Sequence, residues 1–148
     1  GEDTAFFSTN CSMQVPLITA VVDNKAMYPQ PCCPSPYHGF PSALGIESGD
    51  IDKVIADTKQ AISDAGVTGR LSTWPFPAAM MGTVASADYA VKWLNGEVPK
   101  EGVDVAVLNQ LMNDYAGYEV TLNTYEEDGQ TYDTFQMILL PVDAYLTY

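Results

Sequence analysis

Basic residues are scarce in this chain. Its 148 residues include only 6 Lys and Arg against 19 Asp and Glu, which gives a formal net charge of −13. The six cations, which form no cluster along the sequence, are Lys25, Lys53, Lys59, Arg70, Lys92 and Lys100. Nucleic-acid binding draws its affinity from clustered Lys and Arg. The composition therefore excludes nucleic acid as a partner of this segment.

Long apolar runs are also missing. The longest, at residues 15–22 and 137–142, fall far short of the roughly 18 apolar residues of a membrane span. The chain opens Gly-Glu-Asp, without the basic and apolar regions of a signal peptide, so we expect any targeting sequence to lie upstream. Hydrophobic residues make up 47% of the chain, which is typical of a folded globular domain.

Familiar catalytic motifs are absent as well. The sequence has no GxGxxG, P-loop, HExxH or GxSxG motif, which counts against the common enzyme classes. His38 is the only histidine, and three cysteines are an odd number, so no complete disulfide framework can form. We therefore predict no catalytic residue, no metal site and no cofactor.

Strand and helix patterns alternate over the first two thirds of the chain. Short apolar runs rich in β-formers predict strands at residues 4–8, 26–30 and 70–73. Helical spacing and capping residues predict helices at 12–24, 51–65, 77–95 and 105–115. In the third of these helices, the apolar stripe expected to face the core is Met80, Val84, Ala87, Val91 and Leu94.

Two other segments have a distinct character. Residues 31–41 contain four prolines and a glycine, which predicts an irregular loop, and loops this long in compact domains are usually functional. Near the C-terminus, residues 118–125 alternate with period two. An Asp128-Gly129 turn follows, and residues 131–140 form the second arm of a predicted antiparallel hairpin.

This order predicts an α/β fold: a mostly parallel three-layer sheet with a C-terminal antiparallel hairpin. We expect residues 1–148 to form a single ligand-binding lobe. In such sheets ligands sit beyond the carboxyl ends of the strands. The segments expected at those ends are residues 9–11, 30–33 and 73–75.

Three segments carry a resemblance: Phe-Phe-Ser-Thr-Asn-Cys-Ser-Met-Gln-Val-Pro-Leu at 6–17, Tyr-Pro-Gln-Pro-Cys-Cys-Pro-Ser-Pro-Tyr-His-Gly-Phe-Pro at 28–41, and Ser-Thr-Trp-Pro-Phe-Pro-Ala-Ala-Met-Met-Gly at 72–82. They are similar to the C-terminal portion of an uncharacterised bacterial family with a type I periplasmic-binding-protein-like fold. The resemblance spans residues 4–148. It implies a larger protein with a further N-terminal lobe and a small-molecule ligand bound between the two lobes.

Eight residues at or after the strand ends are the expected ligand contacts: Asn10, Gln30, Cys32, Cys33, Tyr37, His38, Thr73 and Trp74. Asn10 and Gln30 could hydrogen-bond a ligand or only cap helices. Trp74 could stack on a flat ligand, or pack in the core as part of a rigid strand-to-helix turn. If these residues form one pocket, Trp74 and His38 lie at the same edge of the sheet.

The cysteines leave other interpretations open. Cys32 and Cys33 with His38 suggest a metal site, but adjacent cysteines are poor zinc ligands. A cysteine nucleophile would need a lowered thiol pKa, which an acid-rich chain disfavours. If the first two strands are parallel neighbours, Cys11 could reach disulfide distance of Cys32 or Cys33.

The sequence thus favours a solute-binding lobe of an extracytoplasmic receptor for uptake or sensing, with no enzymatic activity of its own. The alternative is the effector-binding domain of an intracellular transcriptional regulator, and a cysteine-dependent enzyme is a third interpretation. The expected partners are a small molecule and the missing N-terminal lobe, with no membrane span. An isolated lobe is also expected to self-associate through apolar surface that its partner lobe would cover.

Overall fold

The computed structural model describes residues 1–148 as a mixed α/β chain. The chain divides into two compact units, one formed by residues 1–78 and 145–148 and the other by residues 79–144. No helix in either unit combines the length and the apolar character needed to cross a membrane.

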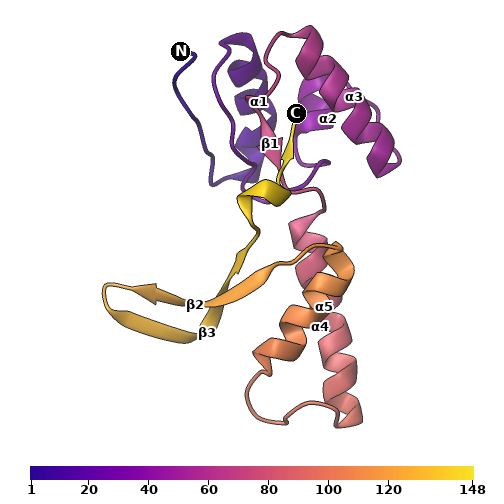
Figure 1. Ribbon diagram of the computed structural model, residues 1–148, viewed down its shortest axis with the longest axis vertical. Helices are drawn as coiled ribbons and strands as arrows, with labels where there is room; N and C mark the ends of the chain where they lie inside the picture. The colour runs from indigo at the N-terminus through magenta and orange to yellow at the C-terminus, as the bar shows by residue number, and fades with distance from the viewer. The chain divides into compact units, whose positions relative to one another are not determined.

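The first unit contains most of the predicted site. Its elements are the 3₁₀ helix η1 (Cys11–Met13), α1 (Gln14–Asp23), α2 (Phe40–Leu44), α3 (Ile51–Asp64), β1 (Ser72–Thr73) and β4 (Leu146–Thr147). Strand β4, at the yellow end of the chain in Figure 1, lies beside β1. The two pair antiparallel, with Ser72 opposite Thr147 and Thr73 opposite Leu146.

Parallel pairing is much more limited than the predicted sheet. It consists of two isolated bridges, Ala5 with Met27 and Tyr28 with Leu71. The predicted strand at 4–8 makes backbone hydrogen bonds to Met27 only around this bridge. The prediction that this strand is buried is wrong, because Phe6 is 42% exposed and Phe7 is 56% exposed. The segment lies at the edge of the bridged array, so one side of it lacks a neighbouring strand.

The predicted irregular loop at 31–41 ends earlier than expected, because α2 begins at Phe40. Pro41 falls in the first turn of this helix, where a missing N–H costs no hydrogen bond. Gly39 precedes the helix with a φ of +84°. A Cβ at this position would lie 2.9 Å from both Gln14 Cβ and Ile18 Cδ1, so only glycine lets the chain pass this close to α1.

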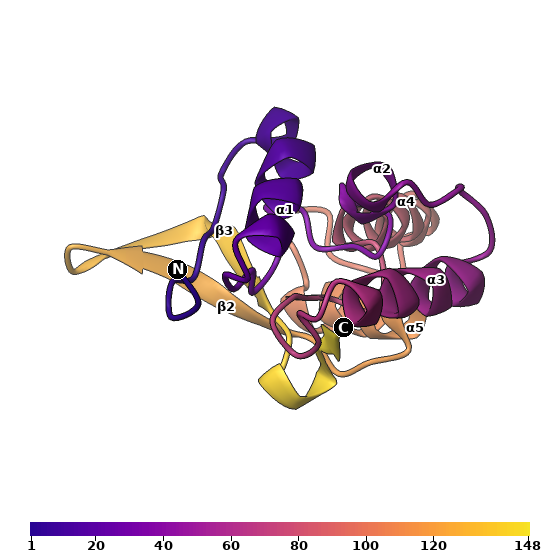
Figure 2. The same ribbon diagram turned by 90° about the horizontal axis from the view of Figure 1, so that it is seen from above.

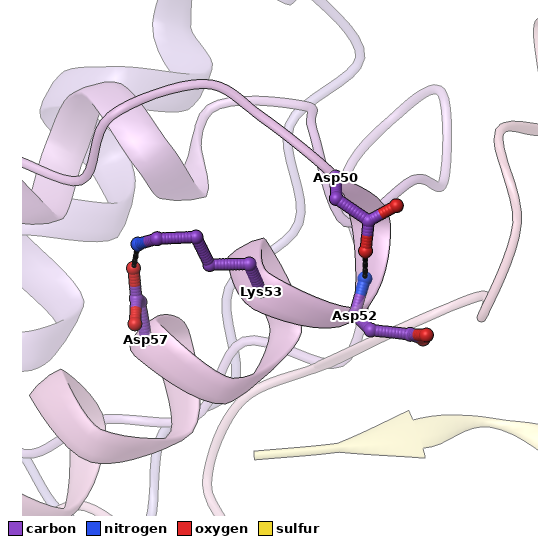
Figure 3. A network of polar contacts seen from close by, with 4 residues as sticks. All are labelled: Asp50, Asp52, Lys53 and Asp57. Atoms are coloured by element: carbon purple, nitrogen blue, oxygen red, sulfur yellow. Dashed lines mark hydrogen bonds and ion pairs between the residues drawn. The ribbon is translucent and has the colours of Figure 1, made fainter.

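Helix α3 begins where the capping pattern predicts. The Asp50 carboxylate accepts a hydrogen bond from the backbone N–H of Asp52 at 3.0 Å, as Figure 3 shows. One turn further on, Lys53 forms an ion pair with Asp57 on the exposed side of the helix. After the helix, Gly66 adopts a φ of +71°, the left-handed conformation that ends many helices.

Helix α2 packs against both α1 and α3, as seen from above in Figure 2. The core beneath these helices consists of Ile18, Val21, Ala26, Tyr28, Phe40, Ile62, Val67, Leu71 and Tyr148. The Phe40 ring lies 6.2 Å from that of Tyr28 and 4.9 Å from that of Tyr148, distances typical of favourable aromatic pairs. The last residue of the chain is thus part of the core of the first unit.

The second unit contains α4 (Ala78–Asn95) apart from its first residue, which belongs to the first unit. It also contains α5 (Val105–Ala116), the strands β2 (Thr121–Glu127) and β3 (Gln130–Leu139), and the 3₁₀ helix η2 (Val142–Ala144). Strands β2 and β3 form an antiparallel hairpin around Asp128 and Gly129. Both turn residues have positive φ, as a tight hairpin turn requires. Asn113 and Asn109 of α5 hold the start of the hairpin by hydrogen bonds to the backbone of Val120, at 2.9 and 3.1 Å.

The predicted apolar stripe of α4 is wrong. Met81 and Ala85 are the buried residues of this helix, whereas Met80, Val91 and Leu94 are exposed, Leu94 by 71%. Apolar residues occur on several sides of α4, so helical spacing alone did not distinguish the buried side.

Candidate functional site

A tight polar turn fixes Cys11 just after the first strand segment. The Ser8 hydroxyl donates to the carbonyl of Asn10 at 3.1 Å, and the backbone N–H of Asn10 donates back to Ser8 Oγ at 3.2 Å. The Asn10 side chain then caps η1, because its Oδ1 accepts from the backbone N–H of Ser12 at 2.9 Å and from Ser12 Oγ at 2.8 Å. Asn10 therefore performs the capping role that the sequence left open.

Residues 31–39 bring a second group of side chains to the same place. Cys32 and Cys33 lie between Pro31 and Pro34, and the turn at Ser35 holds His38 through a backbone hydrogen bond of 3.1 Å. Gly39 then brings the chain against α1. This packing positions His38 close to the cysteines.

The three thiols and the imidazole form one cluster. The Sγ atom of Cys11 lies 3.4 Å from that of Cys32 and 3.8 Å from that of Cys33, and the last two are 4.0 Å apart. His38 Nε2 lies 3.9 Å from Cys32 Sγ. All three cysteines are free thiols. We call Cys11, Cys32, Cys33 and His38 the thiol–imidazole cluster.

Partial burial disfavours the charged forms of Cys32, Cys33 and His38. Burial raises the pKa of Cys32 to about 11, with further contributions from its hydrogen bonds to Cys11 and Cys33. Burial likewise raises the pKa of Cys33 and lowers that of His38. At neutral pH Cys32 and Cys33 are therefore protonated and the imidazole is neutral, which does not favour a thiolate nucleophile.

A second group surrounds the end of β1. The Tyr145 hydroxyl donates to Gln30 Oε1 at 2.8 Å, and the Tyr145 ring lies 6.5 Å from that of Trp74. Trp74 also packs against Phe76, with ring centroids 5.6 Å apart. The backbone N–H of Ala78 donates to the carbonyl of Pro34 at 3.0 Å. This hydrogen bond ties the loop that carries the cluster to the segment after Trp74.

Two buried polar atoms at the carboxyl end of β1 have no hydrogen-bond partner in the chain: Thr73 Oγ1 and Trp74 Nε1. Thr73 is fully buried and Trp74 is 6% exposed. Most buried polar side-chain atoms are hydrogen-bonded, so each exception requires an explanation. A ligand that accepts hydrogen bonds would supply the missing partner for both.

The structure thus gathers the predicted residues into two groups joined by the loop at 31–41. Cys32, Cys33 and His38 belong to the thiol–imidazole cluster, while Gln30, Thr73 and Trp74 lie around the end of β1. The remaining two take local roles in this structure, Asn10 as a cap and Tyr37 as a hydrogen-bond donor to the carbonyl of Gly49 at 3.1 Å. Trp74 is buried, as the alternative interpretation of the Trp-Pro turn expected.

Sequence reasoning missed Tyr145 and left Cys11 out of the expected ligand contacts. Tyr145 reaches Gln30 from a position 115 residues further along the chain, after the hairpin returns. No local pattern marks such a contact. For Cys11 a signal did exist, because the predicted pairing of the first two strands brings their ends together. The bridge between Ala5 and Met27 provides that pairing.

A hollow of about 200 Å³ lies elsewhere in the first unit. Its apolar walls include Phe6, Leu17 and Val21, and Asn24 is its main polar residue. None of the predicted site residues lines it. Because it offers few polar groups to orient a ligand, it is a weaker candidate than the end of β1.

Comparison with known proteins gives a partial family match and a similar fold. Residues 1–72 match a family described as "Protein of unknown function (DUF3798)". The whole chain is similar to part of a crystal structure of a candidate transcriptional regulator from Clostridium difficile 630, with a TM-score of 0.74 and 20% sequence identity. The chain spans 42% of the length of that protein. No curated protein matches the sequence.

Proposed function

We propose that this chain is one lobe of a larger small-molecule binding protein, with its ligand bound beyond the carboxyl end of β1. The observation that carries the proposal is the pair of buried, unpartnered donors there, Thr73 Oγ1 and Trp74 Nε1. Both can donate hydrogen bonds, so the ligand is expected to present acceptor oxygens or nitrogens. A lobe contributes one wall of such a site, and a partner lobe closes it.

The likeness to a crystal structure of which the chain spans 42% supports the idea of a partner lobe. The two parallel bridges, with β4 added antiparallel, support a type I periplasmic-binding-protein-like arrangement of the first unit. We do not propose a nucleophilic role for Cys32, since its raised thiol pKa disfavours the thiolate that such a role needs.

Two settings suit such a lobe. The first is an extracytoplasmic receptor for uptake or sensing. The second is the effector-binding part of an intracellular transcriptional regulator, which the likeness to a candidate regulator favours. The gene sequence upstream of residue 1 distinguishes them: a signal peptide supports the receptor, and a helix-turn-helix segment supports the regulator.

The binding proposal is tested by titrating the chain with a panel of polar metabolites and recording the NMR signals of the two tryptophan indole N–H groups at each step. Trp74 is buried at the proposed site, whereas Trp93 is 40% exposed in the second unit and serves as the internal control. A true ligand shifts the Trp74 resonance, leaves that of Trp93 unchanged and binds more weakly than micromolar. Micromolar or tighter binding by this chain alone would contradict the need for a partner lobe.

Exposed apolar side chains lead us to propose self-association of the isolated chain. In the second unit the exposed large apolar residues include Leu94, Phe135, Met137 and Leu139. Contiguous apolar surface of more than a few hundred Å² commonly marks an interaction site. We expect light scattering to show a mass that rises with protein concentration, and a strictly monomeric mass at high concentration would contradict this.

A further inference from the structure

The three sulfurs of the thiol–imidazole cluster have the spacing of one face of a tetrahedral metal site. A zinc–sulfur bond of about 2.3 Å implies sulfur–sulfur edges of about 3.8 Å in a regular tetrahedron. The three Sγ···Sγ distances among Cys11, Cys32 and Cys33 are 3.4, 3.8 and 4.0 Å. The edge from Cys32 Sγ to His38 Nε2 is 3.9 Å, and the donor atoms of Cys11, Cys32 and His38 all lie within 4.8 Å of one another. Cys33 Sγ lies beside the other two sulfurs but outside this group of three, so it must approach His38 to complete a tetrahedron.

The ligand set also matches a known chemistry. Three cysteines and one histidine form one of the standard structural zinc sites, and soft thiolates select zinc and related thiophilic cations. Adjacent cysteines alone argued against a metal in the sequence. The fold weakens that objection, because Cys11 joins from η1, 21 residues before Cys32, and the compact donor group of Cys11, Cys32 and His38 contains no adjacent pair.

The surrounding backbone holds these donors in place without a metal. The Ser8–Asn10–Ser12 turn fixes Cys11, and Gly39 fixes the loop that carries His38 against α1. Pre-positioned donors reduce the ordering cost of binding. A metal here would link the start of η1 to the loop at 31–41.

A disulfide is the competing outcome for the same sulfurs. Cys11 is nearly equidistant from Cys32 and Cys33, at 3.4 and 3.8 Å, so the geometry favours neither pairing. A disulfide would also leave one thiol and His38 without a role. A metal held by Cys11, Cys32 and His38 gives the imidazole a role, and Cys33 Sγ, next to both other sulfurs, is the candidate fourth donor.

We propose that Cys11, Cys32, Cys33 and His38 bind one thiophilic divalent cation of the zinc class. The site does not depend on the proposed small-molecule function, since it uses neither Thr73 nor Trp74. A bound cation would cross-link η1 to the loop at residues 31–41.

The test uses the full chain, reduced and freed of metal, and titrates it with Co²⁺ and then Zn²⁺. The expected result is one Co²⁺ per chain with strong sulfur-to-cobalt charge-transfer absorption and the intense visible bands of tetrahedral cobalt. Zn²⁺ then displaces the cobalt and abolishes both signals. Absence of charge-transfer absorption in the reduced wild-type chain would overturn the proposal.

Variants assign the ligands. Loss of a residue that only hydrogen-bonds a metal-coordinating side chain costs roughly 10–100-fold in metal affinity. Loss of a coordinating side chain itself should cost at least that much, so we expect this loss for Cys11→Ser, Cys32→Ser, Cys33→Ser and His38→Gln. Cys11 is exposed, so Cys11→Ser is expected to fold normally. A Glu126→Gln/Glu127→Gln double variant, which removes two carboxylates of strand β2 in the second unit, should bind as the wild type does. Charge-transfer bands that survive unchanged in Cys11→Ser would contradict the proposal. So would cobalt binding that is lost only in the Glu126→Gln/Glu127→Gln variant, because the cation would then bind carboxylates and not thiolates.

Discussion

Gly39 offers a quantitative test of how the fold positions His38. Its φ of +84° is unfavourable for any residue with a Cβ, and an added Cβ would lie 2.9 Å from Gln14 Cβ and from Ile18 Cδ1. Gln14 and Ile18 are both buried in α1, and Gln14 Cβ, next to the backbone, cannot move aside cheaply. Gly39→Ala therefore combines backbone strain with overpacking.

The two contributions can be separated by a matched variant. Gly45 ends α2 with a φ of +70°, and nothing lies within 4 Å of a Cβ added there. Gly45→Ala should cost only the backbone term of about 1–2 kcal/mol. Gly39, with a φ of +84° and a ψ of −32°, lies outside the left-handed region, so Gly39→Ala should cost at least that term plus about 1–3 kcal/mol for overpacking. The predicted difference between the variants is therefore at least about 1–3 kcal/mol.

Urea unfolding of the wild type and both variants measures these free energies. If Gly39→Ala is no less stable than Gly45→Ala, the close approach of the loop to α1 is wrong. The placement of His38 in the thiol–imidazole cluster would then lose its support.

Two further predictions concern the first unit. Asp50→Ala should lower the unfolding free energy by about 1 kcal/mol because it removes the cap of α3, whereas Asp50→Asn should retain most of it; equal losses in urea unfolding would contradict the capping role. Burial raises the pKa of Tyr148 above its usual value and that of Tyr28 to about 12, so both hydroxyls favour folding while neutral. Their contribution is complete below pH 10 and is lost as the pH rises from there toward the folded pKa values. Between pH 9 and 11 the free energy of unfolding should therefore fall less for Tyr148→Phe than for the wild type. Parallel curves of unfolding free energy against pH for the two proteins would refute this.

The local capping and turn signals predicted the structure well. Asp50 caps α3 and Asp104 caps α5 by accepting a hydrogen bond from the backbone N–H of Val107, because N-cap chemistry depends only on neighbouring residues. The Asp128-Gly129 turn similarly specifies the hairpin. Where the controlling contacts lie within a few residues, sequence alone is informative.

Features that depend on distant packing were predicted less well. The exposed side of α4 and the exposure of Phe7 depend on what covers them, and local spacing contains no such information. Helix α2 was missed because its prolines suggested irregular structure, although a first-turn proline is compatible with a helix.

The candidate site shows the same division. The strand-end rule led to eight expected contacts. The structure joins Gln30, Cys32, Cys33, His38, Thr73 and Trp74 through one loop and Tyr145, whereas Asn10 and Tyr37 have local roles. The strand-end rule could not predict that the hydrogen-bond donors Thr73 Oγ1 and Trp74 Nε1 would lack a partner. That property depends on the full set of neighbours around each atom.

The most direct test of the ligand proposal compares Thr73→Val with Thr58→Val. Both hydroxyls are fully buried without a partner, but Thr58 lies in α3, away from the end of β1. Replacing either by the isosteric valine should leave stability unchanged or raise it by about 1–3 kcal/mol, because an unsatisfied buried hydroxyl is removed.

Only Thr73→Val should affect the ligand. For any compound that shifts the Trp74 indole resonance, we predict roughly tenfold weaker binding by Thr73→Val, the equivalent of one lost hydrogen bond of about 1.4 kcal/mol. Thr58→Val should bind as the wild type does. Equal affinities in all three proteins would contradict a ligand site at the end of β1.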